Sequence, residues 1–112
     1  MQHTKSLKKN EDFKRVYHTG RYSADKLLVL HVKKNGTQTS RLGISVSKKV
    51  GNSVIRHRIR GLIKEAYRLN ESSVPEGYDL VFSAREGAKD CTYFEIESVL
   101  LRHMKKLGII RE

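Results

Sequence analysis

Residues 47–68, SKKVGNSVIRHRIRGLIKEAYR, place opposite demands on one helix. Seven of these residues are Lys or Arg and one is Glu. Five apolar residues recur at the spacing of a buried helix face: Ile55, Ile59, Leu62, Ile63 and Ala66. Gly51, Asn52 and Ser53 come just before them and can supply a turn and an N-cap. We therefore predict a helix within residues 50–68 that buries one face in a core.

The flank of this predicted helix carries a stripe of positive charge. Arg56, Arg60, Lys64 and Arg68 follow at intervals of four residues, where like charges repel by about 0.2–0.5 kcal/mol per pair. Glu65 alone cannot balance them, so a simply solvated basic face explains the stripe poorly. Phosphates would turn the repulsion into attraction, because Arg binds phosphate oxygens in a bidentate fork and neutralisation releases counterions.

The net charge of the chain also favours a polyanionic partner. The 112 residues include 23 Lys or Arg and 12 Asp or Glu, giving a formal charge of +11. Residues 1–68 hold 17 basic and 4 acidic side chains, whereas residues 69–112 hold 6 and 8. The positive surface is therefore local, as expected for a nucleic-acid interface. The length predicts one domain, residues 1–112.

Three features predict a cytoplasmic protein. Cys91 is the only cysteine, so no intramolecular disulfide can form. The longest aliphatic run, residues 27–30, is far too short to span a membrane. Residues 1–10 lack the apolar core of a signal peptide.

The rest of the chain predicts further helices and strands around the basic helix. Asn10 can cap a short helix over residues 11–18, in which Phe13 and Tyr17 share one face. Alternating apolar residues predict strands over 28–33, 41–47 and 78–84. Thr92 and Glu95 form a capping box before a last helix. This order predicts a single α+β layer domain.

One face of the predicted strand 41–47 consists of very small residues. Gly43, Ser45 and Ser47 alternate there with larger apolar side chains. Such a face can leave room for a ligand, or it can pack tightly against a neighbouring element. Both interpretations stay open at this point.

The sequence offers no catalytic constellation. The basic half of the chain has only four carboxylates, Glu11, Asp12, Asp25 and Glu65, whereas metal-assisted phosphodiester hydrolysis needs clustered ligands. A phosphate-cradling glycine loop is also missing. His103 falls on the apolar face of the last helix and is expected in the core. We predict neither catalytic residues nor a metal site in this chain.

Two segments, LKKNEDFKRVY at 7–17 and RLGISVSKKVGNSVIRHRIRGLIKEAY at 41–67, resemble the protein subunit of bacterial ribonuclease P. The second resembles that family's signature, in which a strand ending in S-K-K leads through G-N into a helix with an R-N-R core. The resemblance implies an α/β sandwich in which a mostly antiparallel four-stranded sheet packs with three helices in the order α-β-β-β-α-β-α. It also implies a left-handed crossover through the signature helix.

The resemblance further implies a protein that assists a catalytic RNA and its magnesium ions in removing the 5′ leader of precursor tRNA. The protein would be a monomer on its own. Residues expected to bind the catalytic RNA are Lys48, Lys49, Asn52, Arg56, Arg58, Arg60, Lys64 and Arg68. Residues expected to line a leader groove between the first helix and the sheet are Phe13, Tyr17, His31 and Ser45. The sequence departs from the family pattern at three positions: His57 replaces Asn, Gly61 replaces a basic residue, and His31 replaces an aromatic residue.

Alternatives remain for both the protein and the groove. A ribosomal or other structural RNA-binding protein would share the charge but would not require a groove for a single-stranded leader. A protein-only nuclease would require the carboxylates that this chain lacks. Phe13 and Tyr17 could stack on unpaired bases or could simply anchor the first helix.

Overall fold

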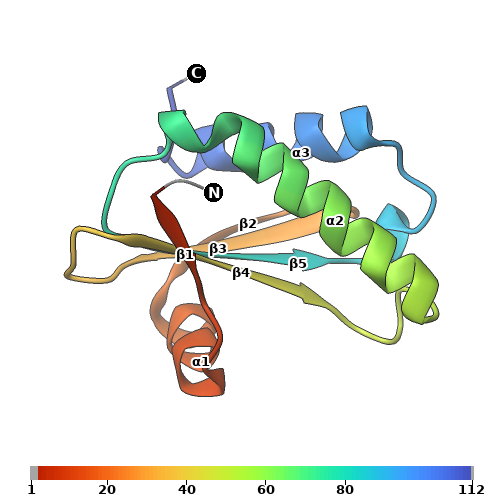
Figure 1. The fold of residues 1–112 in the computed structure, drawn as a ribbon, viewed down its shortest axis with the longest axis horizontal. Helices are drawn as coiled ribbons and strands as arrows, with labels where there is room; N and C mark the ends of the chain where they lie inside the picture. The colour runs from red at the N-terminus through yellow and green to blue at the C-terminus, as the bar shows by residue number, and fades with distance from the viewer. Residues whose placement is uncertain (1–2, 112) are drawn as a thin grey trace.

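The computed structural model describes residues 3–111, over which five strands and three α-helices form one α+β unit (Figure 1). The elements are β1 Thr4–Ser6, α1 Asn10–Thr19, β2 Arg21–Ala24, β3 Leu28–Lys34, β4 Ser40–Val46, α2 Ser53–Asn70, β5 Tyr78–Ala84 and α3 Tyr93–Lys106. Two short 3₁₀ helices, η1 Glu71–Ser73 and η2 Glu86–Ala88, follow α2 and β5.

The strands form one mixed sheet in the order β1-β4-β5-β3-β2. Strand β4 pairs in parallel with both β1 and β5. Strand β3 pairs antiparallel with both β5 and β2. Helix α2 carries the chain from the end of β4 back to the start of β5, and β4 and β5 are therefore parallel.

This sheet corrects two expectations. The described residues form five strands instead of four, and two of the four strand pairings are parallel, so the sheet is not mostly antiparallel. The expected order α-β-β-β-α-β-α is present, but β1 precedes it. Strands β1 and β2 have three and four residues, too few to show an alternating pattern in the sequence.

The two faces of the sheet have different covers. Helices α2 and α3 lie over one face and α1 over the other (Figure 1). The main core lies on the α2/α3 side, where Leu30 and Phe82 of the sheet are fully buried with Ile59, Ile63 and Leu100. A smaller cluster of Leu7, Val16 and Val81, with Phe13 packed against it, holds α1 on the other face. The groove between helix and sheet therefore forms on the α1 side.

Two of the three predicted helix N-caps are confirmed. Asn52 caps α2 by accepting a hydrogen bond from the Ile55 backbone N–H at 3.0 Å. Thr92 and Glu95 form the predicted capping box of α3. The predicted Asn10 cap is wrong, because α1 begins at Asn10 itself and Lys9 occupies the cap position without a side-chain cap bond.

Candidate nucleic-acid interface

Helix α2 separates its apolar and basic side chains as the sequence predicts. Ile59, Ile63, Ala66 and Tyr67 are buried against the sheet and α3. Most of the predicted basic residues are exposed, and Lys48 and Lys49 are exposed on the turn that leads into the helix. His57 and Gly61 are exposed as well, and nothing lies within 4 Å of a Cβ built on Gly61. The missing side chain at Gly61 therefore leaves an open place on the basic flank of α2.

The basic residues of α2 differ in what they contact. The Arg60 guanidinium donates to the backbone oxygen of Ile44 at 3.0 Å, which holds it against β4. Arg58 donates to the backbone oxygen of Cys91 at 2.7 Å, so it lies on the flank toward the start of α3. Arg68 forms a two-point pair with Glu65, at 2.6 and 3.0 Å. The Nε atom of Arg56 is buried without a hydrogen-bond partner in the described structure.

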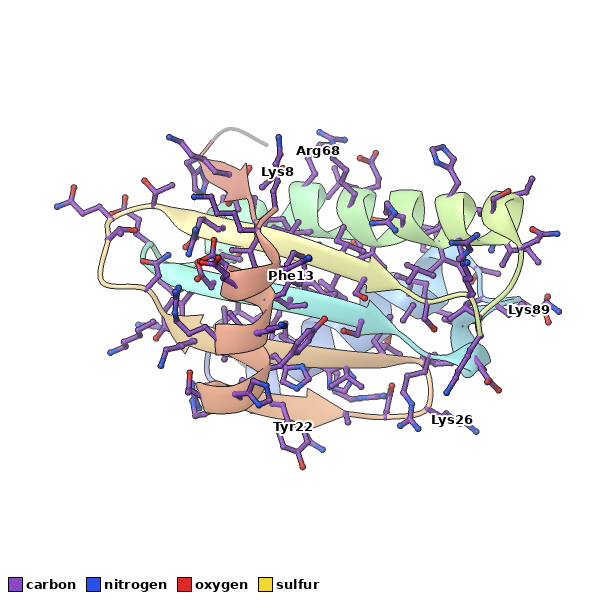
Figure 2. The ribbon with its side chains drawn as sticks, turned by 90° about the horizontal axis from the view of Figure 1, so that it is seen from below. Lys8, Phe13, Tyr22, Lys26, Arg68 and Lys89 are labelled. Atoms are coloured by element: carbon purple, nitrogen blue, oxygen red, sulfur yellow. The ribbon has the colours of Figure 1, made fainter. Side chains whose placement is uncertain are left out.

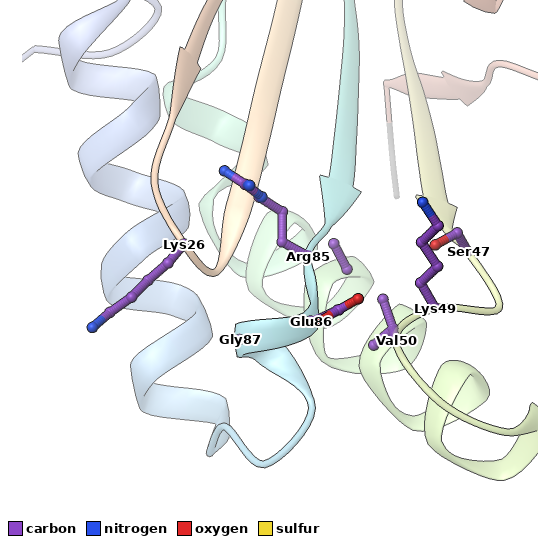
Figure 3. Close-up of a pocket in the computed structure, with 8 residues that line it drawn as sticks. Lys26, Ser47, Lys49, Val50, Arg85, Glu86 and Gly87 are labelled. Atoms are coloured by element: carbon purple, nitrogen blue, oxygen red, sulfur yellow. The ribbon is translucent and has the colours of Figure 1, made fainter.

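Further cations surround the ends of β4 and β5 (Figure 3). Ser47 and Lys49 follow β4, and Arg85 and Glu86 follow β5, at the rim of a pocket of about 440 Å³. Lys26 adds a third cation to the lining. The sequence did not predict Lys26 or Arg85 as site residues, because only the pairing of β5 with both β3 and β4 brings these segments together.

Helix α1 forms one wall of a groove on the other face of the sheet. We call it the aromatic groove; it has a volume of about 320 Å³ and is lined by Asn10, Phe13, Tyr17, Ile44, Ser45, Val46 and Arg60. The Phe13 ring packs on Gly43, where an added Cβ would lie 2.7 Å from two ring carbons. Both interpretations of the small-residue face of β4 therefore hold, each at a different residue. Gly43 packs tightly against a neighbouring element, whereas Ser45 borders open space that could hold a ligand.

A row of rings extends from this groove across the sheet. Tyr17 contacts the edge of His31 with ring centroids 5.0 Å apart, and His31 stacks with Tyr22 at 5.6 Å. Tyr22 is 66% exposed and lies directly across from His31 in the β2–β3 pairing. The Tyr17 hydroxyl lies 3.4 Å from the Ser83 hydroxyl. Tyr22 and Ser83 are site residues that the sequence did not predict, because only the strand register reveals them.

Burial controls the charge of His31. Desolvation lowers the pKa of its imidazole below the ordinary 6.5, and its Nδ1 atom is buried without a hydrogen-bond partner in the described structure. The ring is therefore neutral at neutral pH. The neutral ring is stacked on Tyr22 and in T-shaped contact with Tyr17, so it joins the two tyrosines and contributes no charge toward phosphates.

An ion-pair network fixes α1 against the sheet. Arg41 of β4 forms a two-point pair with the buried carboxylate of Asp79, at 2.8 and 2.7 Å. Its remaining nitrogen donates to Asp12 of α1 at 3.1 Å. The hydrogen bonds and charge of Asp79, assisted by Asp12, raise the pKa of Arg41 although burial opposes this. The network neutralises two carboxylates that would otherwise repel an anionic ligand near the groove.

A buried Ser-His-Asp arrangement has a structural role. The Ser23 hydroxyl lies 2.7 Å from His103 Nδ1, and His103 Nε2 lies 3.4 Å from Asp25. His103 is 1% exposed and Ser23 is 9% exposed, so substrate cannot reach them. The three residues tie α3 to β2 and its following turn, which confirms the expected core position of His103.

The described residues provide neither a cluster of metal ligands nor a membrane-spanning helix. Within residues 3–111, no group of three or more His, Cys, Asp or Glu is placed to hold a metal ion. None of the helices described is long and apolar enough to cross a membrane.

The exposed cations of α2 beside an aromatic groove define an RNA-binding protein of the α+β class. The family model for Ribonuclease P matches residues 1–108. The ribonuclease P protein component of Alkaliphilus metalliredigens is 49% identical over 110 residues, covering 98% of this chain and 99% of that protein. The component of Clostridium novyi is 51% identical over 111 residues, covering 97% and 98%.

Solved structures agree with these relatives. The RNase P protein of Staphylococcus aureus has a TM-score of 0.87 at 34% identity, covering 97% of this chain and 98% of that one. The RNase P protein of Thermotoga maritima has a TM-score of 0.79 at 26% identity, covering 88% and 93%. The chain belongs to the ribonuclease P protein family. Members of this family are the protein component of an endoribonuclease that acts in tRNA 5′-end maturation.

Proposed function

We propose that α2 docks on the catalytic RNA of ribonuclease P while the aromatic groove holds the 5′ leader of precursor tRNA. The observation that carries this proposal is the shared position of Arg60, a basic residue of α2 that also lines the aromatic groove. One helix then contributes to both RNA surfaces. The protein promotes removal of the leader by binding, and the catalytic RNA performs the hydrolysis.

The surface for the catalytic RNA is built around the N-terminal end and basic flank of α2. It comprises Lys48, Lys49, Asn52, Arg56, Arg58, Arg60, Lys64 and Arg68. Its support is electrostatic, since each phosphate neutralised by Lys or Arg releases counterions. The Arg68–Glu65 pair is exposed, so it stabilises the helix little and can exchange for a phosphate at small cost.

The leader surface comprises Phe13, Tyr17, His31 and Ser45. Aromatic rings stack on unpaired bases for about 1–3 kcal/mol per base without requiring a particular sequence. Tyr17 lines the groove beside the open space at Ser45, and His31 contacts Tyr17 outside the lining of the groove. Tyr22 extends the row beyond the groove, where it is exposed enough to stack on a further base.

The remaining parts of the proposal concern the assembly. Magnesium ions in the holoenzyme are held mainly by RNA, because Mg²⁺ prefers phosphate oxygens and retains several waters. The chain acts as a single domain, residues 1–112, that is monomeric alone and works in the cytoplasm. The β4–α2–β5 crossover is left-handed; the order of β4, β5 and α2 in Figures 1 and 2 supports this hand.

The leader assignment is tested with Tyr17→Ala in a holoenzyme reconstituted with a bacterial ribonuclease P RNA. We expect precursor tRNA to bind about 5- to 150-fold more weakly, the equivalent of about 1–3 kcal/mol. Mature tRNA should bind as before, because it has no leader. Phe94→Ala is the matched control, since Phe94 is an exposed aromatic residue on α3 in the opposite layer. Equal losses for precursor and mature tRNA would refute the leader assignment.

A further inference from the structure

A second groove lies on the other side of Arg60, between the end of β1 and helix α2. We call it the Lys8 groove; it has a volume of about 230 Å³ and is lined by Ser6, Leu7, Lys8, Leu42, Ile44, Arg60 and Lys64. Figure 2 shows Lys8 on the same side of the molecule as Arg68 of α2. Lys8 lies outside α2 and its preceding turn, which carry the basic residues discussed so far.

The strand pairing explains why these residues meet. Strand β1 pairs in parallel with β4 as far as Ser6, opposite Leu42. The Leu7 backbone N–H then donates to the Leu42 oxygen at 2.8 Å, and the Leu7 side chain is buried under α1. Lys8 therefore leaves the sheet beside the edge of β4. Arg60 and Lys64, one helical turn apart, reach the same edge from α2.

The cations of the Lys8 groove have no acidic partner among residues 3–111, in contrast to four arginines elsewhere in the fold. Arg15, Arg41, Arg68 and Arg102 each pair with a carboxylate. Across residues 3–111, no carboxylate lies within 4.0 Å of the charged atoms of Lys8, Arg60 or Lys64. Three unpaired cations thus surround an apolar floor of Leu42 and Ile44. Such a site suits a ligand with several negative charges and an apolar body between them.

We propose that the Lys8 groove binds the sugar-phosphate backbone of the catalytic RNA, with Lys8 and Lys64 on its phosphates. This inference rests on the proposed function and adds a surface outside α2 to it. Arg60 and Ile44 line both grooves, so they form the ridge between them. The catalytic RNA and the leader therefore meet at Arg60. Lys8 contacts only the catalytic RNA, and Tyr17 contacts only the leader.

The test measures binding of the protein to a bacterial ribonuclease P RNA, without tRNA, over a range of salt concentrations. Lys8→Gln removes the charge at an exposed position. We expect weaker binding and a log-log salt slope reduced by about 0.7–0.9, the value for one lost phosphate contact. Lys34→Gln is the control, because Lys34 is equally exposed at the end of β3. The control should leave the slope unchanged.

Tests with precursor and mature tRNA separate the two grooves. In the holoenzyme, Lys8→Gln should retain the preference for precursor tRNA, whereas Arg60→Gln should lose both RNA affinity and that preference. An unchanged slope for Lys8→Gln, or an equal reduction for Lys34→Gln, would overturn the Lys8 groove as a specific site. Loss of the precursor preference in Lys8→Gln would overturn it too, by assigning the groove to the leader. If wild-type protein failed to bind the RNA, the proposed function itself would fall; if wild type binds and only the slope prediction fails, the proposed function stands.

Discussion

Replacing Arg41 with Met tests how much a buried ion pair contributes to the stability of this protein, compared with an exposed pair. The substitution keeps most of the side-chain volume and removes the charged partner of Asp79, whose side chain is only 4% exposed and keeps a hydrogen bond from the Asn35 amide. Breaking a buried pair from one side typically costs about 3–5 kcal/mol. Because the Arg41 side chain is 31% exposed and water can reach the gap, we expect the low end, about 3 kcal/mol.

Arg15→Met provides the matched control. Arg15 pairs with Asp12 at 2.9 Å, and Asp12 also pairs with Arg41, but the Arg15 side chain is 52% exposed. Its loss should cost no more than about 1 kcal/mol. Urea unfolding followed by circular dichroism measures both values. Equal, small losses in the two variants would refute the reasoning that the Arg41–Asp79 pair holds β4, β5 and α1 together.

Three further predictions follow from the same contacts. Gly43→Ala should displace the Phe13 ring and lower the free energy of unfolding by up to about 2 kcal/mol, because overpacking outweighs the gain from replacing a strand glycine. In urea unfolding, the double variant with Phe13→Leu should regain the lost stability. Burial lowers the pKa of His31, so as the pH falls the unfolded chain binds a proton before the folded chain does, and stability should fall below about pH 6.5. His31→Phe should flatten that part of a series of unfolding free energies measured against pH. An unchanged series would contradict this prediction. Thr92→Ala should cost about 0.5–2 kcal/mol through loss of the α3 capping box, whereas Ser98→Ala, at an exposed position inside α3, should stay within about 0.5 kcal/mol of wild type.

The long elements could be predicted from the sequence because their patterns repeat. Helix α2 shows its apolar spacing over several turns and has an Asn cap, and β5 shows a full alternation over Tyr78–Ala84. Strands β1 and β2 are too short for any period to appear. Their place in the sheet depends on backbone pairing with β4 and β3, which no local pattern encodes.

The candidate site shows the same division. Phe13, Tyr17 and Ser45 come together as the family resemblance implies, and His31 joins them through its contact with Tyr17. Tyr22 joins only because the β2–β3 register places it opposite His31. The partner of Arg58 is a backbone oxygen 33 residues away, which charge spacing alone cannot indicate. Residue type and spacing therefore indicate candidate ligand-binding residues, whereas strand pairing decides which residues share a groove.

The distribution of ion pairs explains how a chain with a charge of +11 keeps a compact fold while exposing a binding surface. Carboxylates neutralise the arginines that join layers: Asp79 and Asp12 at Arg41, and Asp25 at Arg102. Within residues 3–111, Lys8 and Lys64 around Arg60 have no such partners, so their mutual repulsion persists in the free protein. A bound RNA removes that repulsion, and a ligand that binds only the folded state stabilises it. Under the proposed function, the opposite demands on residues 47–68 are met together, because an RNA bound to α2 would also reduce the repulsion among its cations.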